Sequence, residues 1–176
     1  IILDFAHTPD ALEQSLQALQ KQFKKKIIIV FGCGGERDKQ KRFKMGKIAN
    51  KYCKKIYITD DNPRNENPSL IRENLTKHCD NFYNIPNRLK AIKKGFALLK
   101  KNNGILFIIG KGHEETQVYK NITHKFSDIE ESIKTIITAE YKKIGADDSM
   151  SVLFVPEEEH NETTIKSISD LDTTIA

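Results

Sequence analysis

Short apolar runs alternate with longer amphipathic runs along most of the chain. The apolar runs are rich in β-branched residues and predict strands over residues 1–5, 26–31, 55–59, 82–85 and 105–109. The amphipathic runs between them predict helices over residues 9–23, 41–52, 68–78 and 88–100. A further helix is expected to begin after Ser127 and to run to about residue 143.

The alternation of strands and helices predicts a mostly parallel sheet with helices on both faces. The predicted strands are apolar at nearly every position, which is typical of strands that are covered on both faces. We therefore predict a Rossmann-like α/β fold with five or six mostly parallel strands. The apolar run 27–31 is expected in a central position of that sheet.

The sequence changes character near residue 145. Residues 145–148 predict a break in the helix, and beyond them only residues 151–155 have the pattern of a strand. Residues 145–176 contain eight Asp or Glu and one Lys, whereas the whole chain has a net charge of +5. We expect one domain over residues 1–143 and an acidic, flexible extension over residues 144–176, of which residues 146–176 are expected to be dispensable for folding.

Composition narrows the class of protein. No apolar run approaches the ~20 residues of a membrane span, so we expect no membrane association. The three cysteines lack paired spacing, which favours a cytoplasmic location. The lysines of residues 1–144 lie in helix-like segments without interleaved aromatics. A solvated surface therefore explains them better than a nucleic-acid-binding site does. Because the chain opens on an apolar run without a methionine, we expect it to be a piece of a longer protein.

Four polar motifs follow predicted strands. They are DFAHTPD at 4–10, GCGGERDKQKR at 32–42, DDNPR at 60–64 and GKGHE at 110–114. Ligands of open parallel sheets bind at the carboxyl ends of the strands, so these loops are expected to share one edge. A structure that separates Arg64 and Glu114 on opposite faces would contradict this hypothesis.

Each motif has a chemical and a purely structural explanation. Asp4 and His7 could hold ribose and phosphate, or could satisfy local backbone groups. The glycines of the second motif let an anion approach the backbone, but the motif lacks the order of a Walker loop. The planar guanidinium of Arg64 could bind both oxygens of a carboxylate, although the sequence around it is also typical of a simple turn. Glu114 could pair with an ammonium group.

Together the four motifs resemble those of the amino-acid-adding Mur ligases. Residues 4–12 are similar to the DYAHTPDAL segment that opens the family's C-terminal domain, with Phe5 in place of tyrosine. Residues 32–42 are similar to its GCGGDRDxxKR loop. Residues 61–64 and 110–114 are similar to the DNPR and GKGHE motifs of the branch that adds meso-diaminopimelate.

The resemblance implies an ATP- and Mg²⁺-dependent ligase of peptidoglycan synthesis. Such an enzyme joins meso-diaminopimelate to UDP-N-acetylmuramoyl-L-alanyl-D-glutamate through an acyl phosphate. This chain would supply the domain that brings in the amino acid. The P-loop, the metal ligands and the UDP-binding domain of the family lie in segments that precede it, so the chain alone is not expected to catalyse ligation.

The resemblance also implies the roles of individual residues. The diaminopimelate-binding residues would be Arg37, Asp61, Asn62, Pro63, Arg64, Gly110 and Glu114. Asp4 and His7 would face the nucleotide, and no catalytic residue or metal ligand is assigned. A substrate with two carboxylates and two ammonium groups needs arginines and acids in one pocket. Arg64 favours diaminopimelate over lysine, which lacks the extra carboxylate.

Two other classes of function remain open. One is an amino-acid- or nucleotide-binding module without turnover. The other is a related ligase, either a lysine-adding enzyme or one of the folylpolyglutamate type. A Gly-Thr-x-Gly-Lys-Thr loop upstream would distinguish an enzyme from a binding module.

Overall fold

The computed structural model describes residues 1–141 and 153–154, and its centre is a sheet in which every neighbouring pair of strands is parallel. The strand order is β4-β3-β2-β5-β1-β8. These strands are β1 (Ile2–Asp4), β2 (Lys26–Phe31), β3 (Lys55–Ile58), β4 (Phe82–Asn84), β5 (Gly104–Ile109) and β8 (Leu153–Phe154). The predicted α/β class is confirmed.

Strand β2 occupies the central position that its apolar sequence predicts. It lies between β3 and β5, with Val30 paired to Tyr57 on one side and to Ile108 on the other. Successive side chains of a strand point to opposite faces. Ile29 accordingly belongs to one hydrophobic core and Val30 to the other, and both are fully buried.

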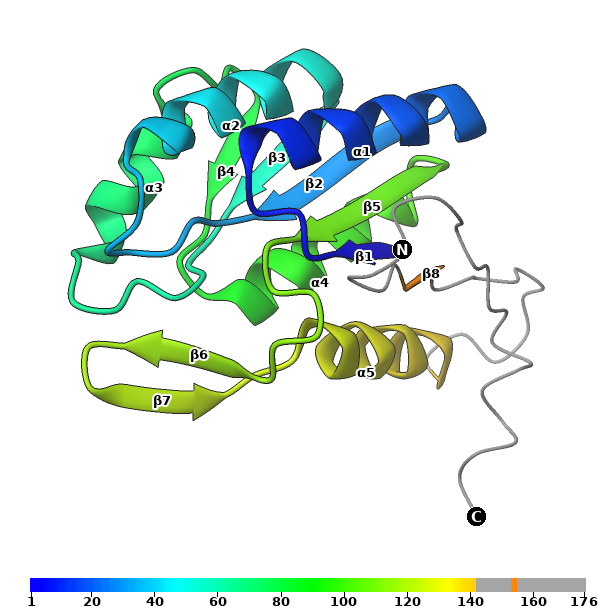
Figure 1. The fold of residues 1–176 in the computed structure, drawn as a ribbon. Helices are drawn as coiled ribbons and strands as arrows, with labels where there is room; N and C mark the ends of the chain where they lie inside the picture. The colour runs from blue at the N-terminus through cyan, green and yellow to red at the C-terminus, as the bar shows by residue number, and fades with distance from the viewer. Residues whose placement is uncertain (142–152, 155–176) are drawn as a thin grey trace.

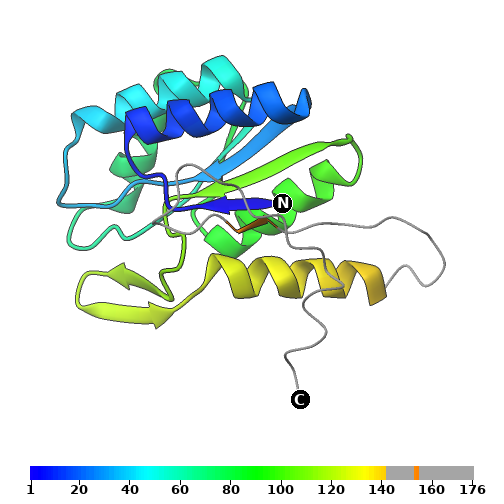
Figure 2. The ribbon, with the colours of Figure 1, turned by 45° about the vertical axis from the view of Figure 1, so that its right-hand side comes forward.

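Helices cover both faces of the sheet (Figure 1, Figure 2). On one face lie α1 (Pro9–Phe23), α2 (Gln40–Tyr52) and α3 (Pro68–Thr76). On the other face lie α4 (Arg88–Leu99) and α5 (Asp128–Tyr141). None of the helices in the described residues has the length and apolar character needed to cross a membrane.

The amino end of α1 forms as its sequence predicts. The Thr8 hydroxyl accepts a hydrogen bond from the Ala11 amide at 3.3 Å, and Pro9 is the first helical residue. A cap of this kind satisfies an amide that the helix itself leaves unpaired. Leu12, Leu16 and Leu19 then point into the core. The other predicted helices and strands begin and end within two residues of the observed bounds.

An antiparallel hairpin was not predicted from the sequence. It consists of β6 (Thr116–Tyr119) and β7 (Ile122–Lys125), which follow β5 and precede α5 in the chain. In space the hairpin lies outside the central sheet (Figure 1). All four residues of β7 are exposed, and neither strand contributes to a hydrophobic core. Such a hairpin gives little hydrophobic periodicity for a prediction to use.

Strand β8 pairs in parallel with β1, so that Leu153 lies opposite Ile2. It coincides with the part of residues 151–155 that has the pattern of a strand. The remaining expectations for residues 144–176, including flexibility and dispensability, fall on residues outside the described ranges.

Candidate functional site

The four polar motifs occupy one edge of the sheet, which we call the carboxyl edge because β1, β2, β3 and β5 end there. These strands are parallel neighbours, so their following loops meet. The Gly35 amide donates a hydrogen bond to the Asn62 carbonyl at 2.8 Å, and the Gly110 amide donates one to the Asp4 carbonyl at 3.2 Å. The sequence hypothesis of a shared edge is confirmed.

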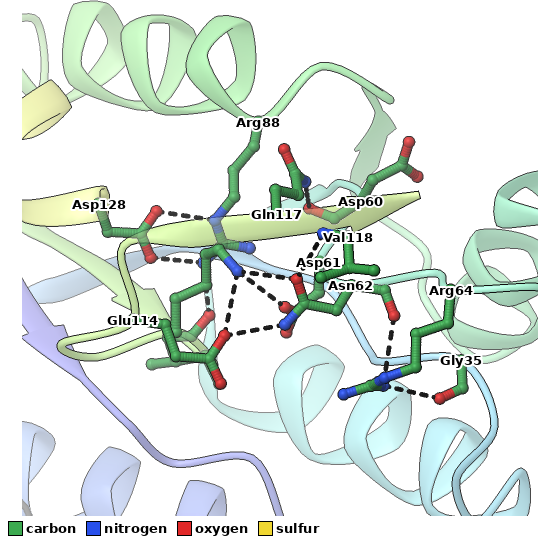
Figure 3. Close-up of polar contacts among 12 residues, drawn as sticks. Gly35, Asp60, Asp61, Asn62, Arg64, Arg88, Glu114, Gln117, Val118 and Asp128 are labelled. Carbon is green, nitrogen blue, oxygen red and sulfur yellow. Dashed lines mark hydrogen bonds and ion pairs between the residues drawn. The ribbon is translucent and has the colours of Figure 1, made fainter. Parts of the chain in front are cut away.

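A buried lysine, Lys111, joins the side chains of Asp61, Asn62 and Glu114, labelled in Figure 3, at this edge. Lys111 has no solvent exposure, and its Nζ lies 3.5 Å from Asp61 Oδ1 and 3.2 Å from both Asn62 Oδ1 and Glu114 Oε2. The amide of Asn62 also donates to Glu114 Oε2 at 2.8 Å. A buried charge is tolerated only with such partners, so Lys111 ties the loops after β3 and β5 together.

This network gives the two acids different positions. Asp61 is buried, and its carboxylate faces the Lys111 ammonium. The side chain of Glu114 is 36% exposed, and within the described residues its hydrogen bonds run through Oε2 alone. Glu114 therefore presents a carboxylate oxygen at the surface, whereas Asp61 contributes charge from below.

Arg64 lies on the other side of Asn62 from Glu114 (Figure 3). Its Nη1 donates to the Gly35 carbonyl at 2.8 Å and to the Asn62 carbonyl at 3.5 Å. Its backbone adopts the left-handed region with φ 51°, which a residue with a side chain rarely occupies. Arg64 and Glu114 thus both contact Asn62, from different sides, and lie at the same edge of the sheet, as the sequence analysis predicted.

Arg37 is exposed and borders the same loop. A Cβ built on Gly34 would lie 3.9 Å from Arg37 Cγ and 2.9 Å from Arg64 Nη1, so the two arginines flank one glycine. A side chain at position 34 would displace the Arg64 guanidinium from its present place beside the glycine loop.

An ion pair between a buried arginine and a partly exposed glutamate supports the glycine loop. The Arg42 guanidinium is 1% exposed and binds both carboxylate oxygens of Glu66, at 2.9 and 3.0 Å, as well as the Gly34 carbonyl at 3.2 Å. The hydrogen bond from Arg42 holds the pKa of Glu66 below its ordinary value. Glu66 in turn accepts a hydrogen bond from the Glu36 amide, which fixes the turn before Arg37.

Pro63 and Gly110 shape the backbone around these side chains. The Pro63 carbonyl would lie 1.9 Å from a Cβ on Gly35, so the two loops touch through their backbones. Gly110 has φ 110°, and a Cβ there would lie 3.0 Å from Asp61 Oδ2. Only glycine meets both conditions at position 110 without strain.

Asp4 and His7 lie at the same edge but in different environments. The carboxylate of Asp4 is buried and accepts hydrogen bonds from the Ala6 amide at 3.0 Å and the Ser15 hydroxyl at 2.8 Å. His7 is exposed, and its ring meets Phe5 edge-on at 4.8 Å between centroids. Asp4 therefore shapes the turn after β1, and His7 is the more accessible of the two.

Three charged residues of this region were missed by sequence reasoning. Arg88 is buried and binds Asp128 through two hydrogen bonds of 2.7 and 2.6 Å, behind the site (Figure 3). Each residue stands at the start of a helix without a recognisable motif, so the pairing across 40 residues leaves no local signal. Lys111 stood inside a motif but received no role.

The part of the chain that the structure describes contains no group of three or more His, Cys, Asp or Glu side chains placed to hold a metal ion. At the carboxyl edge a buried lysine, two carboxylates and Arg64 surround Asn62, and Arg37 borders the neighbouring Gly34. Such an arrangement suits a zwitterionic ligand, because it offers partners for both carboxylate and ammonium groups.

Comparison with known proteins supports a specific relationship. Residues 1–112 match the family model "Mur ligase, glutamate ligase domain". The UDP-N-acetylmuramoyl-L-alanyl-D-glutamate--2,6-diaminopimelate ligase of Anaplasma marginale (strain St. Maries) is 46% identical over 129 residues, which cover 73% of this chain and 27% of that protein. The protein of the same name from Buchnera aphidicola subsp. Schizaphis graminum (strain Sg) is 46% identical over 140 residues, with 77% and 28% covered.

A solved structure of a UDP-N-acetylmuramoyl-L-alanyl-D-glutamate--2,6-diaminopimelate ligase superposes with a TM-score of 0.71 at 36% identity. The superposition covers 78% of this chain and 29% of that chain. The chain thus spans somewhat more than a quarter of the length of these relatives.

Proposed function

The chain belongs to the Mur ligase family, and we propose that it forms the amino-acid-binding part of an ATP-dependent ligase that adds meso-diaminopimelate to UDP-N-acetylmuramoyl-L-alanyl-D-glutamate. The observation that carries this proposal is the convergence of Arg64 and Glu114 on Asn62. We place the domain at residues 1–143 and the reaction in the cytoplasm, as a step of peptidoglycan synthesis.

Arg64 is the proposed partner of the carboxylate that distinguishes diaminopimelate from lysine. Within the described residues its side-chain hydrogen bonds run through Nη1, which leaves the Nε and Nη2 donors for a ligand. These two donors match the two oxygens of a carboxylate. Arg37, across Gly34, is the proposed partner of a carboxylate as well.

Glu114 is the proposed partner of a substrate ammonium group. Its carboxylate is accessible, and Lys111 and Asn62 hold it in place from one side. Asp61 adds negative charge below it, while Asn62, Pro63 and Gly110 form the backbone around it. Bound in this way, the amino acid would be held at two ends, which orients its reacting amine.

ATP is the second proposed substrate, with Asp4 and His7 facing the nucleotide. Their support is their place at the same edge, where the Lys41 ammonium also donates to the His7 carbonyl at 3.1 Å. Mg²⁺, which would neutralise phosphate charge, does not fit the described residues, because they contain no cluster of metal ligands. We therefore assign the ion and most nucleotide contacts to other parts of the complete enzyme.

The test is steady-state kinetics of the full-length protein carrying Arg64→Ala, with diaminopimelate, lysine and ATP as varied substrates. Loss of a charge-assisted contact worth roughly 1.5–3 kcal/mol raises the KM for diaminopimelate by about 10- to 100-fold. The KM for ATP should stay within about twofold, because Arg64 is not among the proposed nucleotide contacts.

Lys93→Ala serves as the control, because it removes an exposed cation from helix α4 outside the proposed pocket. Unchanged diaminopimelate kinetics in the Arg64→Ala protein would contradict the substrate assignment. Binding of diaminopimelate by the full-length protein without any ATP turnover would instead identify an amino-acid-binding module.

A further inference from the structure

Strand β6 of the unpredicted hairpin lies against the loop that carries Arg64. We call residues 60–64 the 60–64 loop. The backbone of Arg64 pairs with β6 as a short parallel bridge opposite Tyr119. Its amide donates to the Val118 carbonyl at 3.0 Å, and its carbonyl accepts from the Lys120 amide at 2.7 Å. Both backbone polar groups of Arg64 are therefore engaged by the hairpin.

Three further hydrogen bonds join β6 to the same loop. The Val118 amide donates to Asn62 Oδ1 at 3.0 Å, and the Gln117 side-chain amide donates to the Asp60 carbonyl at 3.0 Å (Figure 3). The Tyr119 hydroxyl donates to Asp60 Oδ2 at 3.0 Å. Gln117 is only 7% exposed, so its amide has little access to water as an alternative partner.

These contacts bear on the left-handed backbone of Arg64. A residue with a side chain pays a conformational cost at φ 51°, and it keeps that conformation only where its surroundings hold it. The direction of the Arg64 side chain depends on this backbone conformation. Val118 of β6 and the adjoining Lys120 bind the amide and the carbonyl of Arg64, and so hold the backbone from which its side chain extends.

The hairpin also differs from the residues before it in which known proteins it matches. The family model ends at residue 112, before β6 begins. The relatives named 2,6-diaminopimelate ligases match over 73% and 77% of the chain, and any continuous stretch of that length includes residues 116–119. Strand β6 thus lies outside the family-wide match but inside the matches to these ligases.

We propose that β6 is a specificity-determining element, in which Gln117 and Tyr119 are positioning residues that fix the 60–64 loop so that Arg64 can select an amino acid with a distal carboxylate. This inference rests on the proposed function. Gln117 and Tyr119 act through Asp60 and do not themselves contact the substrate.

The experiment compares the full-length protein with its Gln117→Leu/Tyr119→Phe double variant. The substitutions keep the size of each side chain and remove both hydrogen bonds to Asp60. Each lost bond should cost about 2- to 10-fold, so the KM for diaminopimelate should rise roughly 4- to 100-fold. The preference for diaminopimelate over lysine in kcat/KM should fall by a similar factor, while the KM for ATP stays within about twofold.

Thr123→Ala is the matched control, because Thr123 is exposed on β7 directly opposite Val118. It should leave the KM values and the preference as they are in the wild type. Tyr119→Phe alone, which removes one hydroxyl, provides a milder test if the double variant does not fold. Its expected rise in KM for diaminopimelate is about 2- to 10-fold.

The outcomes separate this inference from the proposed function. If the wild type uses diaminopimelate and the variants keep its KM and preference, the specificity role of β6 is overturned and the proposed function stands. A fall in kcat alone, equal for diaminopimelate and lysine, would show a merely structural hairpin and overturn it too. If the wild type does not use diaminopimelate, both proposals fall together.

Discussion

Among single residues, Lys111 sets the charge balance of the carboxyl edge. Its ammonium has no exposure to solvent and lies between Asp61 and Glu114. Without it, the buried Asp61 carboxylate and the partly exposed Glu114 carboxylate would lose the cation that they share. Desolvation makes such a buried charge costly once its partner is removed. Lys111 therefore supports the fold and the proposed pocket together.

Lys111→Met should destabilise the protein by about 3–5 kcal/mol, because removing one member of a buried ionic group leaves the others uncompensated. Denaturant unfolding measures this loss. Lys90→Met, at an exposed position of α4, should change the free energy of unfolding by no more than about 0.5 kcal/mol. An equal effect of the two substitutions on the free energy of unfolding would show that Lys111 contributes no more to stability than an exposed lysine does.

Glu66 makes the stability of the fold depend on pH. The hydrogen bond from Arg42 lowers the pKa of Glu66 from 4.5 in the folded state. A carboxylate with a lowered folded pKa stabilises the fold above its unfolded pKa, and this stabilisation is lost as the pH falls through the folded value. The free energy of unfolding should therefore decline below about pH 4.5.

Glu66→Gln should show a shallower decline over that range, because glutamine has no proton to gain. Urea unfolding of both proteins from about pH 7 to about pH 3 gives the comparison. Parallel curves would mean that Glu66 contributes nothing to the acid dependence.

Among the elements, α5 is anchored by an ionic contact as well as by apolar packing. Asp128 is the first residue of α5, and it binds Arg88 at the start of α4. Arg88 Nη2 also donates to the Ile109 carbonyl at 2.9 Å, at the end of β5. This pair joins two helices and a strand directly behind the site.

Asp128→Ala should cost about 3–5 kcal/mol in the free energy of unfolding, since it leaves the Arg88 guanidinium buried without its partner. The double variant Arg88→Met/Asp128→Leu should recover a large part of this loss. Glu130→Ala, whose partners Lys125 and Lys134 are exposed, should cost less than about 1 kcal/mol. If the double variant were no more stable than Asp128→Ala, the cost would lie in packing and not in the unpaired charge.

For the molecule as a whole, the sequence predicted the sheet well because its signals are local. Apolar runs and capping residues such as Thr8 mark where strands and helices begin. The meeting of the four motifs followed from the strand-end rule. The contacts within the site could not be predicted in this way, because Lys111–Asp61 and Arg88–Asp128 join residues far apart in the chain. The hairpin β6–β7 escaped prediction because its short strands contribute nothing to either core.

That separation of the hairpin from both cores has a further consequence. Substitutions in a hydrophobic core are constrained by the need to fill space, whereas a surface hairpin held by polar contacts escapes this constraint. The main-chain bonds from Val118 and Lys120 to Arg64 also tolerate many side chains at these positions. If β6 sets the direction of Arg64 as proposed, substitutions in segment 116–125 could change the amino-acid preference without altering either hydrophobic core.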